Sequence, residues 1–131
     1  MAAEESYPDD LRYHREHDWA RIDGDEATMG VTWFAQDALG ELVHFEAPTH
    51  GSHTTKDSTY GEVESVKAVS DVIAPLSGEV IEVNQAVVDA PETVNEDPYG
   101  AGWLVRIRLA DPSEVDSLLD VAAYKQVLAD Q

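Results

Sequence analysis

The sequence contains no cysteine and few basic residues, and each shortage excludes a class of function. The absence of cysteine from all 131 residues excludes a disulfide scaffold, a thiolate zinc site, a cysteine nucleophile and a CxxC redox pair. Eight lysines and arginines accompany twenty-seven aspartates and glutamates, giving a formal net charge of −19. Because so few basic side chains cannot neutralise phosphates or an anionic membrane surface, neither nucleic acid nor membrane is expected as a partner.

Long hydrophobic runs are also missing, since no apolar stretch approaches the length of a membrane span. The first residues lack the basic region of a signal peptide and the arginine-rich bias of a transit peptide. We therefore expect a cytoplasmic protein, with the mature form of a mitochondrial matrix protein as the alternative. The length suits a single domain, which we place at residues 11–131 behind a flexible acidic tail at residues 1–10.

Short strand-like runs separated by turn residues indicate a mainly β fold. Strands are expected at residues 61–66, 71–74, 79–84 and 103–109, and the last shows the clearest alternation of apolar and polar side chains. That alternation should turn Arg106 and Arg108 toward solvent.

Capping residues predict short helices between and after these strands. Thr32 can cap a helix that ends at Gly40. Near the C-terminus, Asp111 is followed by a proline and, three residues after the cap, by a glutamate, which is typical of a helix start. Asp120 can cap a second helix.

Candidate metal and catalytic motifs are weak. His14 and His17 are three residues apart, as are His50 and His53, but neither pair lies in a convincing helix and no complete ligand set accompanies them. No GxSxG elbow, phosphate-binding loop or GxGxxG motif is present. We therefore expect neither a metal site nor catalytic residues.

Lys67 stands out because it lies between two strand-like runs with no glycine or asparagine to mark the reversal. A lysine at a solvated hairpin tip is one interpretation, since lysines favour exposed positions. Under the other, an exposed primary amine on a stiff hairpin is a substrate for acylation. Acylation would remove the charge and leave a neutral swinging arm.

With these residues in view, the chain resembles the glycine cleavage system H protein over nearly all of residues 13–128. The matching runs are EHDW at 16–19, GVT at 30–32, AQDALG at 35–40, GEVESVKA at 61–68, APLSGEVIEVN at 74–84, VNEDPYGAGWL at 94–104 and DPSE at 111–114. So many blocks in the same order make a chance match implausible.

The resemblance implies a lipoyl/biotinyl-type flattened β-barrel, or barrel-sandwich hybrid, with a C-terminal helix pair. It implies that Lys67 at a hairpin tip carries lipoic acid in amide linkage, and that Glu64 and Gly78 are recognised for lipoylation. Considered by itself, Gly78 is expected to be a turn glycine with positive φ, and the two roles can coexist.

The resemblance also implies a noncatalytic carrier with several partners. The P protein (glycine decarboxylase) passes an aminomethyl group to the lipoyl arm, and the T protein (aminomethyltransferase) moves the one-carbon unit to tetrahydrofolate. The L protein (dihydrolipoyl dehydrogenase) then reoxidises the arm, which a lipoate-attaching enzyme first installs. We expect the carrier itself to be a monomer.

A cleft for the loaded arm is implied around Glu16, Asp18 and Asp71. Asp18 stands where glutamate is more usual in the family, and Ala38 takes the place of a histidine found in some members. Docking in such a cleft would exclude water, and a carboxylate there could pair with an ammonium group.

Other functions remain open from the sequence. A lipoyl domain of a 2-oxo acid dehydrogenase typically has Asp-Lys-Ala where this chain has Val66-Lys67-Ala68, and biotin carriers flank the lysine with methionines that are absent here. An H-like lipoyl donor or redox-signalling scaffold would look much the same around Lys67. An acidic interaction protein would need no modified lysine.

Overall fold

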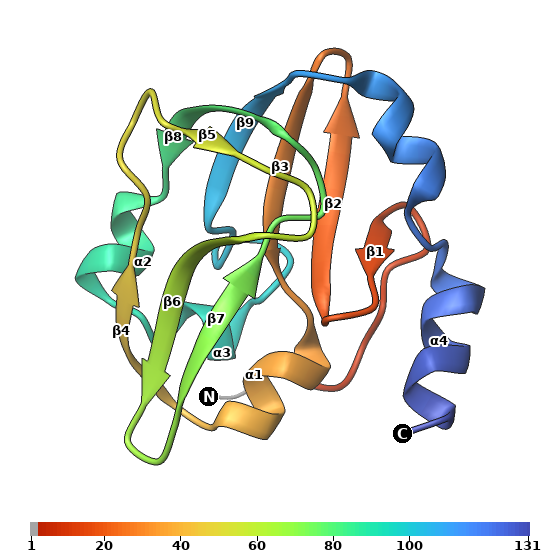
Figure 1. The fold of residues 1–131 in the computed structure, drawn as a ribbon. Helices are drawn as coiled ribbons and strands as arrows, with labels where there is room; N and C mark the ends of the chain where they lie inside the picture. The colour runs from red at the N-terminus through yellow and green to blue at the C-terminus, as the bar shows by residue number, and fades with distance from the viewer. Residues whose placement is uncertain (1–2) are drawn as a thin grey trace.

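Two antiparallel sheets form the body of the protein in this computed structural model, which describes residues 3–131 (Figure 1). The larger sheet has the order β1-β2-β3-β9-β8-β5 and comprises β1 (Arg12–His14), β2 (Asp18–Asp23), β3 (Glu26–Val31), β5 (His53–Thr54), β8 (Gly78–Val83) and β9 (Val105–Leu109). The smaller sheet has the order β4-β6-β7 and comprises β4 (Leu42–Glu46), β6 (Thr59–Ser65) and β7 (Val69–Ile73). Within residues 3–131 the strand ladders form two separate sheets in a sandwich-type arrangement.

Short helices connect and flank the sheets: α1 (Trp33–Leu39), α2 (Gln85–Asp89), α3 (Thr93–Glu96), the 3₁₀ helix η1 (Pro112–Ser117) and α4 (Val121–Ala129). The expected mainly β fold with short helices is thereby confirmed. Figure 1 shows α1 beside the β6–β7 hairpin and α4 beside β1.

The apolar faces of both sheets meet in a common core, as the alternation in β9 predicts. Val105 and Ile107 are fully buried, whereas Arg108 is exposed and Arg106 is half-buried. A second cluster is largely aromatic and packs between β1, β2 and α4; it contains Leu11, Tyr13, Trp19, Tyr99 and Tyr124. The rings of Tyr13 and Tyr124 stack with centroids 4.7 Å apart, so α4 is anchored to the edge strand β1.

The predicted caps of the first and last helices are confirmed. The Thr32 hydroxyl accepts from the Ala35 amide at the start of α1, and the Gly40 amide donates to Gln36 at its end. Asp120 caps α4 through the Ala123 amide.

The first member of the C-terminal helix pair is a 3₁₀ helix. Asp111 caps it through the Ser113 amide, but the Glu114 carboxylate accepts from the amide (2.8 Å) and hydroxyl (3.0 Å) of Ser77. Glu114 therefore supports the turn before β8 instead of reaching back to its own cap.

The segment expected to be a flexible tail is docked against the domain over residues 3–10. The Ala3 carbonyl accepts from the Trp33 indole (2.8 Å), and the Ser6 carbonyl accepts from the Tyr99 hydroxyl (2.7 Å). Tyr7 packs edge-on against Tyr124 with ring centroids 5.6 Å apart. Large aromatic side chains thus give the segment partners that its acidic composition did not suggest. The remaining tail residues, 1 and 2, lie outside the described residues.

Candidate functional site

The β6–β7 hairpin places Lys67 at its tip, where the residue is exposed. The strands pair up to Glu64 and Val69, and the Ser65 amide donates to the Ala68 carbonyl (2.8 Å) across the reversal. The buried Ser65 hydroxyl also accepts from the amides of Lys67 (3.3 Å) and Ala68 (3.2 Å). A serine side chain therefore organises the turn that lacks glycine and asparagine.

Apolar side chains are unusually exposed on both sides of this lysine. Val66 is 86% exposed and Val69 is 59% exposed. The lysine side chain passes close to the end of α1, since a Cβ added at Gly40 would lie 3.6 Å from Lys67 Cε. The amine is thus presented beyond the sheet, on a tip with solvent-exposed apolar residues.

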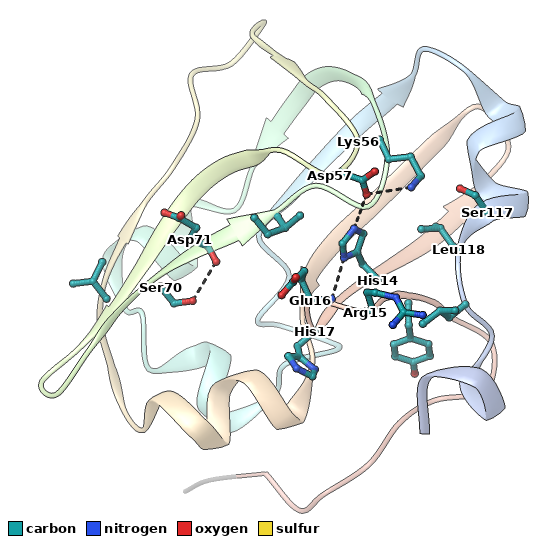
Figure 2. A pocket seen from close by; sticks show the side chains of 14 residues that line it. His14, Arg15, Glu16, His17, Lys56, Asp57, Ser70, Asp71, Ser117 and Leu118 are labelled. Carbon is teal, nitrogen blue, oxygen red and sulfur yellow. Dashed lines mark hydrogen bonds and ion pairs between the residues drawn. The ribbon is translucent and has the colours of Figure 1, made fainter. Parts of the chain in front are cut away.

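A cleft of about 920 Å³ runs beside this hairpin, between β7 and the β1–β2 turn (Figure 2). Its β7 wall comes from Val69, Ser70, Asp71 and Ile73, and the opposite wall comes from Tyr13 to His17, Lys56, Asp57 and Ser117 to Leu119. The β7 wall begins at Val69, two residues after Lys67. An arm attached to Lys67 would therefore start at the mouth of the cleft.

Two of the three carboxylates expected in the cleft do line it. Glu16 is exposed and extends from the β1–β2 turn toward β7, and Asp71 is exposed on β7 itself. The Asp71 carboxylate points away from Glu16 and lies over β6 in Figure 2, consistent with its register opposite Glu62. Of the three expected carboxylates, Glu16 is therefore the one that faces into the cleft.

Asp18, the third expected residue, is buried and is not among the residues that line the cleft. It is the first residue of β2 and only 2% exposed. Burial raises its pKa well above the ordinary value, and a hydrogen bond from the Ile73 backbone amide opposes that shift. The shorter aspartate thus lies between the sheets, where a charged carboxylate is disfavoured.

A polar cluster that sequence spacing could not reveal closes one end of the cleft. His14 Nε2 lies 2.7 Å from Asp57 Oδ1, and the ammonium of Lys56 lies 3.2 Å from the same oxygen. His14 Nδ1 accepts from the Glu16 amide (3.0 Å), so Nε2 carries the proton given to Asp57. These hydrogen bonds hold the pKa of Asp57 below its usual value.

Backbone strain also concentrates at the cleft. His17 (φ 74°) and Asp57 (φ 71°) are the only non-glycine residues with positive φ in the described chain, and both line it. Such conformations cost about 1–2 kcal/mol each, and they persist where neighbouring contacts hold them. His17 Nδ1 lies 2.8 Å from the Tyr124 hydroxyl, and burial lowers the pKa of the ring.

The two residues associated with lipoylation recognition lie in different sheets. Glu64 is exposed on β6, opposite His44 and Val69. Gly78 is buried at the start of β8, and its φ is not positive, contrary to the expectation of a left-handed turn glycine. The residue is required for a steric reason, because a Cβ at this position would overlap the Arg108 carbonyl oxygen on β9.

Within residues 3–131, no group of three or more histidine, aspartate or glutamate side chains is arranged to hold a metal ion. No helix in the same range is long and apolar enough to cross a membrane.

Comparison with known proteins connects this geometry to a family. The family model described as glycine cleavage H-protein matches residues 11–131. The chain belongs to the glycine cleavage H-protein family. It is therefore a lipoyl-carrier subunit of the glycine cleavage system and not a catalyst.

Individual members of the H-protein family agree along nearly the whole chain. The glycine cleavage system H protein of Anaeromyxobacter sp. (strain K) is 51% identical over 124 residues, covering 95% of this chain and 97% of the relative. That of Myxococcus xanthus is 49% identical over 124 residues, covering 95% and 96%. The crystal structure of an H protein from Mycobacterium marinum has a TM-score of 0.84 and 41% identity, covering 92% of this chain and 97% of that one.

Proposed function

We propose that Lys67 of this H-protein family member carries lipoic acid in amide linkage, and that the arm transports aminomethyl groups in the glycine cleavage system. The observation that carries the proposal is the exposed amine at the tip of an ordered hairpin, directly beside a cleft. Amide formation removes the lysine charge. The bound group supplies the dithiolane that accepts and releases the cargo, while the polypeptide presents and shields it.

The residues around the cleft suit the shielding of a cationic cargo. Glu16 offers an exposed carboxylate toward β7, which can pair with an ammonium group. Asp71 lies on the same wall as the first residues after Lys67, although its carboxylate would have to rotate to face Glu16. Asp18 is buried and does not line the cleft, so it is not proposed as a ligand of the cargo.

Glu64 and Gly78 contribute to recognition by the lipoate-attaching enzyme in different ways. Glu64 is exposed on the hairpin, so it can contact that enzyme directly. Gly78 is buried, so it acts by allowing β8 and β9 to approach. We propose that substitution of Gly78 impairs lipoylation through the fold of the domain.

The partners proposed for the loaded and unloaded arm are the P, T and L proteins of the same system. An acidic carrier with a net charge of −19 favours encounters with basic surfaces, and such steering weakens as salt rises. The bacterial relatives support a cytoplasmic location.

The test is glycine–bicarbonate exchange with the P protein, comparing Lys67→Arg with Lys125→Arg after expression with lipoate. Lys67→Arg should abolish exchange with little effect on thermal unfolding, because the side chain is exposed and packs in no core. Lys125 is an exposed lysine on α4, so its variant controls for loss of a lysine and should retain activity. Exchange by Lys67→Arg at the rate of the control would contradict the proposal.

A further inference from the structure

The β1–β2 turn that carries Glu16 has a backbone conformation in which glycine would be less strained. Three residues connect the paired His14 and Asp18, and the His17 amide donates to the His14 carbonyl (3.0 Å). His17, the last residue of this loop, has a φ of 74° at a position where three-residue hairpin loops favour glycine. Its Nδ1 lies 2.8 Å from the Tyr124 hydroxyl, so a contact with α4 holds this end of the turn.

The turn before β6, on the same wall of the cleft, is strained in the same way. The Ser58 amide donates to the Thr55 carbonyl (2.9 Å), which makes Asp57 the third residue of a four-residue turn. Its φ of 71° at this position favours glycine or asparagine. Non-glycine residues in such conformations persist where contacts hold them, and they cluster at functional sites. The contact made by Asp57 is with His14.

His14 connects the two turns. Its side chain is only 10% exposed, and Nε2 donates to Asp57 Oδ1 (2.7 Å) while Nδ1 accepts from the Glu16 amide (3.0 Å). Figure 2 shows both hydrogen bonds, with the Glu16 side chain extending from the turn toward β7. Because both ring nitrogens are engaged, the ring cannot rotate without breaking a hydrogen bond. The position of Asp57 therefore determines where the Glu16 backbone is held.

We propose that Asp57 and His14 are positioning residues that hold Glu16 toward the cleft, and that this arrangement protects a cationic aminomethyl cargo from water. The inference rests on the proposed function, because it requires the loaded arm to enter the cleft. Asp57 Oδ1 is already engaged by His14 and by the ammonium of Lys56 (3.2 Å). Among residues 3–131, no hydrogen bond or ion pair engages the Glu16 carboxylate, so Glu16 is available to an ammonium group.

The first test follows hydrogen exchange at the Glu16 amide in the unmodified protein, so it needs no lipoyl group. Asp57→Gly fits the left-handed backbone but removes the acceptor for His14, and it should accelerate exchange several-fold. Asp57→Asn is the matched control, because asparagine tolerates this conformation and its amide oxygen still accepts from Nε2. Thermal unfolding of the two variants should be alike. Equal exchange at Glu16 in both variants would overturn the proposal.

The second test measures loss of cargo from protein loaded by the P protein with glycine and then separated from it. Water adds to the cargo carbon as its bond to sulfur breaks, which yields the thiol, formaldehyde and ammonia. Without the T protein, ammonia release should be several-fold faster from Asp57→Gly than from the wild type, and close to the wild-type rate from Asp57→Asn.

The contrary results of this second test are distinguishable. Loss from Asp57→Asn as fast as from Asp57→Gly would make the Asp57 carboxylate itself the ligand and refute the positioning role. Loss from both loaded variants at the wild-type rate would overturn this inference alone. A wild-type protein that accepts no cargo would instead contradict the proposed function, and this inference with it.

Discussion

The two sheets differ in how charged side chains are paired across neighbouring strands. In the larger sheet, β8 and β9 place Glu79 opposite Arg108 and Glu82 opposite Arg106, and both pairs form ion pairs. Both arginines of β9 are therefore paired with glutamates of the neighbouring strand β8. Exposed pairs of this kind contribute only about 0–1 kcal/mol each, but they leave little net charge for a partner.

The smaller sheet places like charges side by side. Glu46, Glu62 and Asp71 stand in register across β4, β6 and β7, and the described strands of this sheet contain no lysine or arginine. Like charges directly opposite one another destabilise a sheet. The sheet that carries Lys67 therefore keeps an acidic face although that face lowers its stability. Such a face is expected of a surface that meets basic partners, whereas the larger sheet serves as the scaffold.

The largest loss of stability is expected from Gly78→Ala, which disturbs the packing of β8 against β9 in the larger sheet. Overlap between the new Cβ and the Arg108 carbonyl oxygen should cost about 3 kcal/mol, the upper end of common overpacking penalties. Gly24→Ala is the control, because nothing lies within 4 Å of its Cβ and only its φ of +63° is unfavourable, at about 1 kcal/mol. Chemical denaturation measures both. A Gly78→Ala variant no less stable than Gly24→Ala would disprove the steric explanation.

An intermediate effect is expected from Ser65→Ala at the hairpin tip. Loss of the hydroxyl removes the acceptor for the Lys67 and Ala68 amides and should cost about 1 kcal/mol. The variant should also be lipoylated more slowly, because the tip is less ordered. Ser70→Ala is the matched control, since its exposed hydroxyl bonds only to the neighbouring Asp71 carbonyl. If both variants accept lipoate at the wild-type rate, the ordered turn is unimportant for modification.

The smallest effect on stability is expected from charge reversals that test the difference between the two sheets. Glu62→Lys interrupts the acidic row and should stabilise the protein by about 0.2–1 kcal/mol, whereas Glu82→Lys breaks an ion pair and should destabilise it by a similar amount. The rate of aminomethyl transfer from the P protein should nevertheless fall with Glu62→Lys and remain unchanged with Glu82→Lys. If both variants changed stability and transfer in the same way, the proposed difference between the acidic sheet and the scaffold sheet would be wrong.

Local features of the fold were predictable because their causes are local. Thr32 and Gly40 bound α1 through side-chain and backbone capping that a few neighbouring residues determine. The alternation in β9 likewise predicted the exposed Arg108. The register of β6 and β7 then placed Lys67 at the tip, as the two flanking strand-like runs required.

Features of the site that depend on tertiary contacts were not predictable. His14 and Asp57 are 43 positions apart and meet only because the end of β1 and the turn before β6 converge at the cleft. The requirement for Gly78 depends on the approach of β9, so it does not follow from sequence spacing.

The most direct test of the central claim is the chemical state of Lys67 after expression with lipoate and an active lipoate-attaching enzyme. Intact-mass and peptide mass spectrometry should show a single lipoyl group, located on Lys67 and absent from Lys56 and Lys125. Unmodified Lys67, beside a control carrier lipoylated in the same cells, would contradict the account.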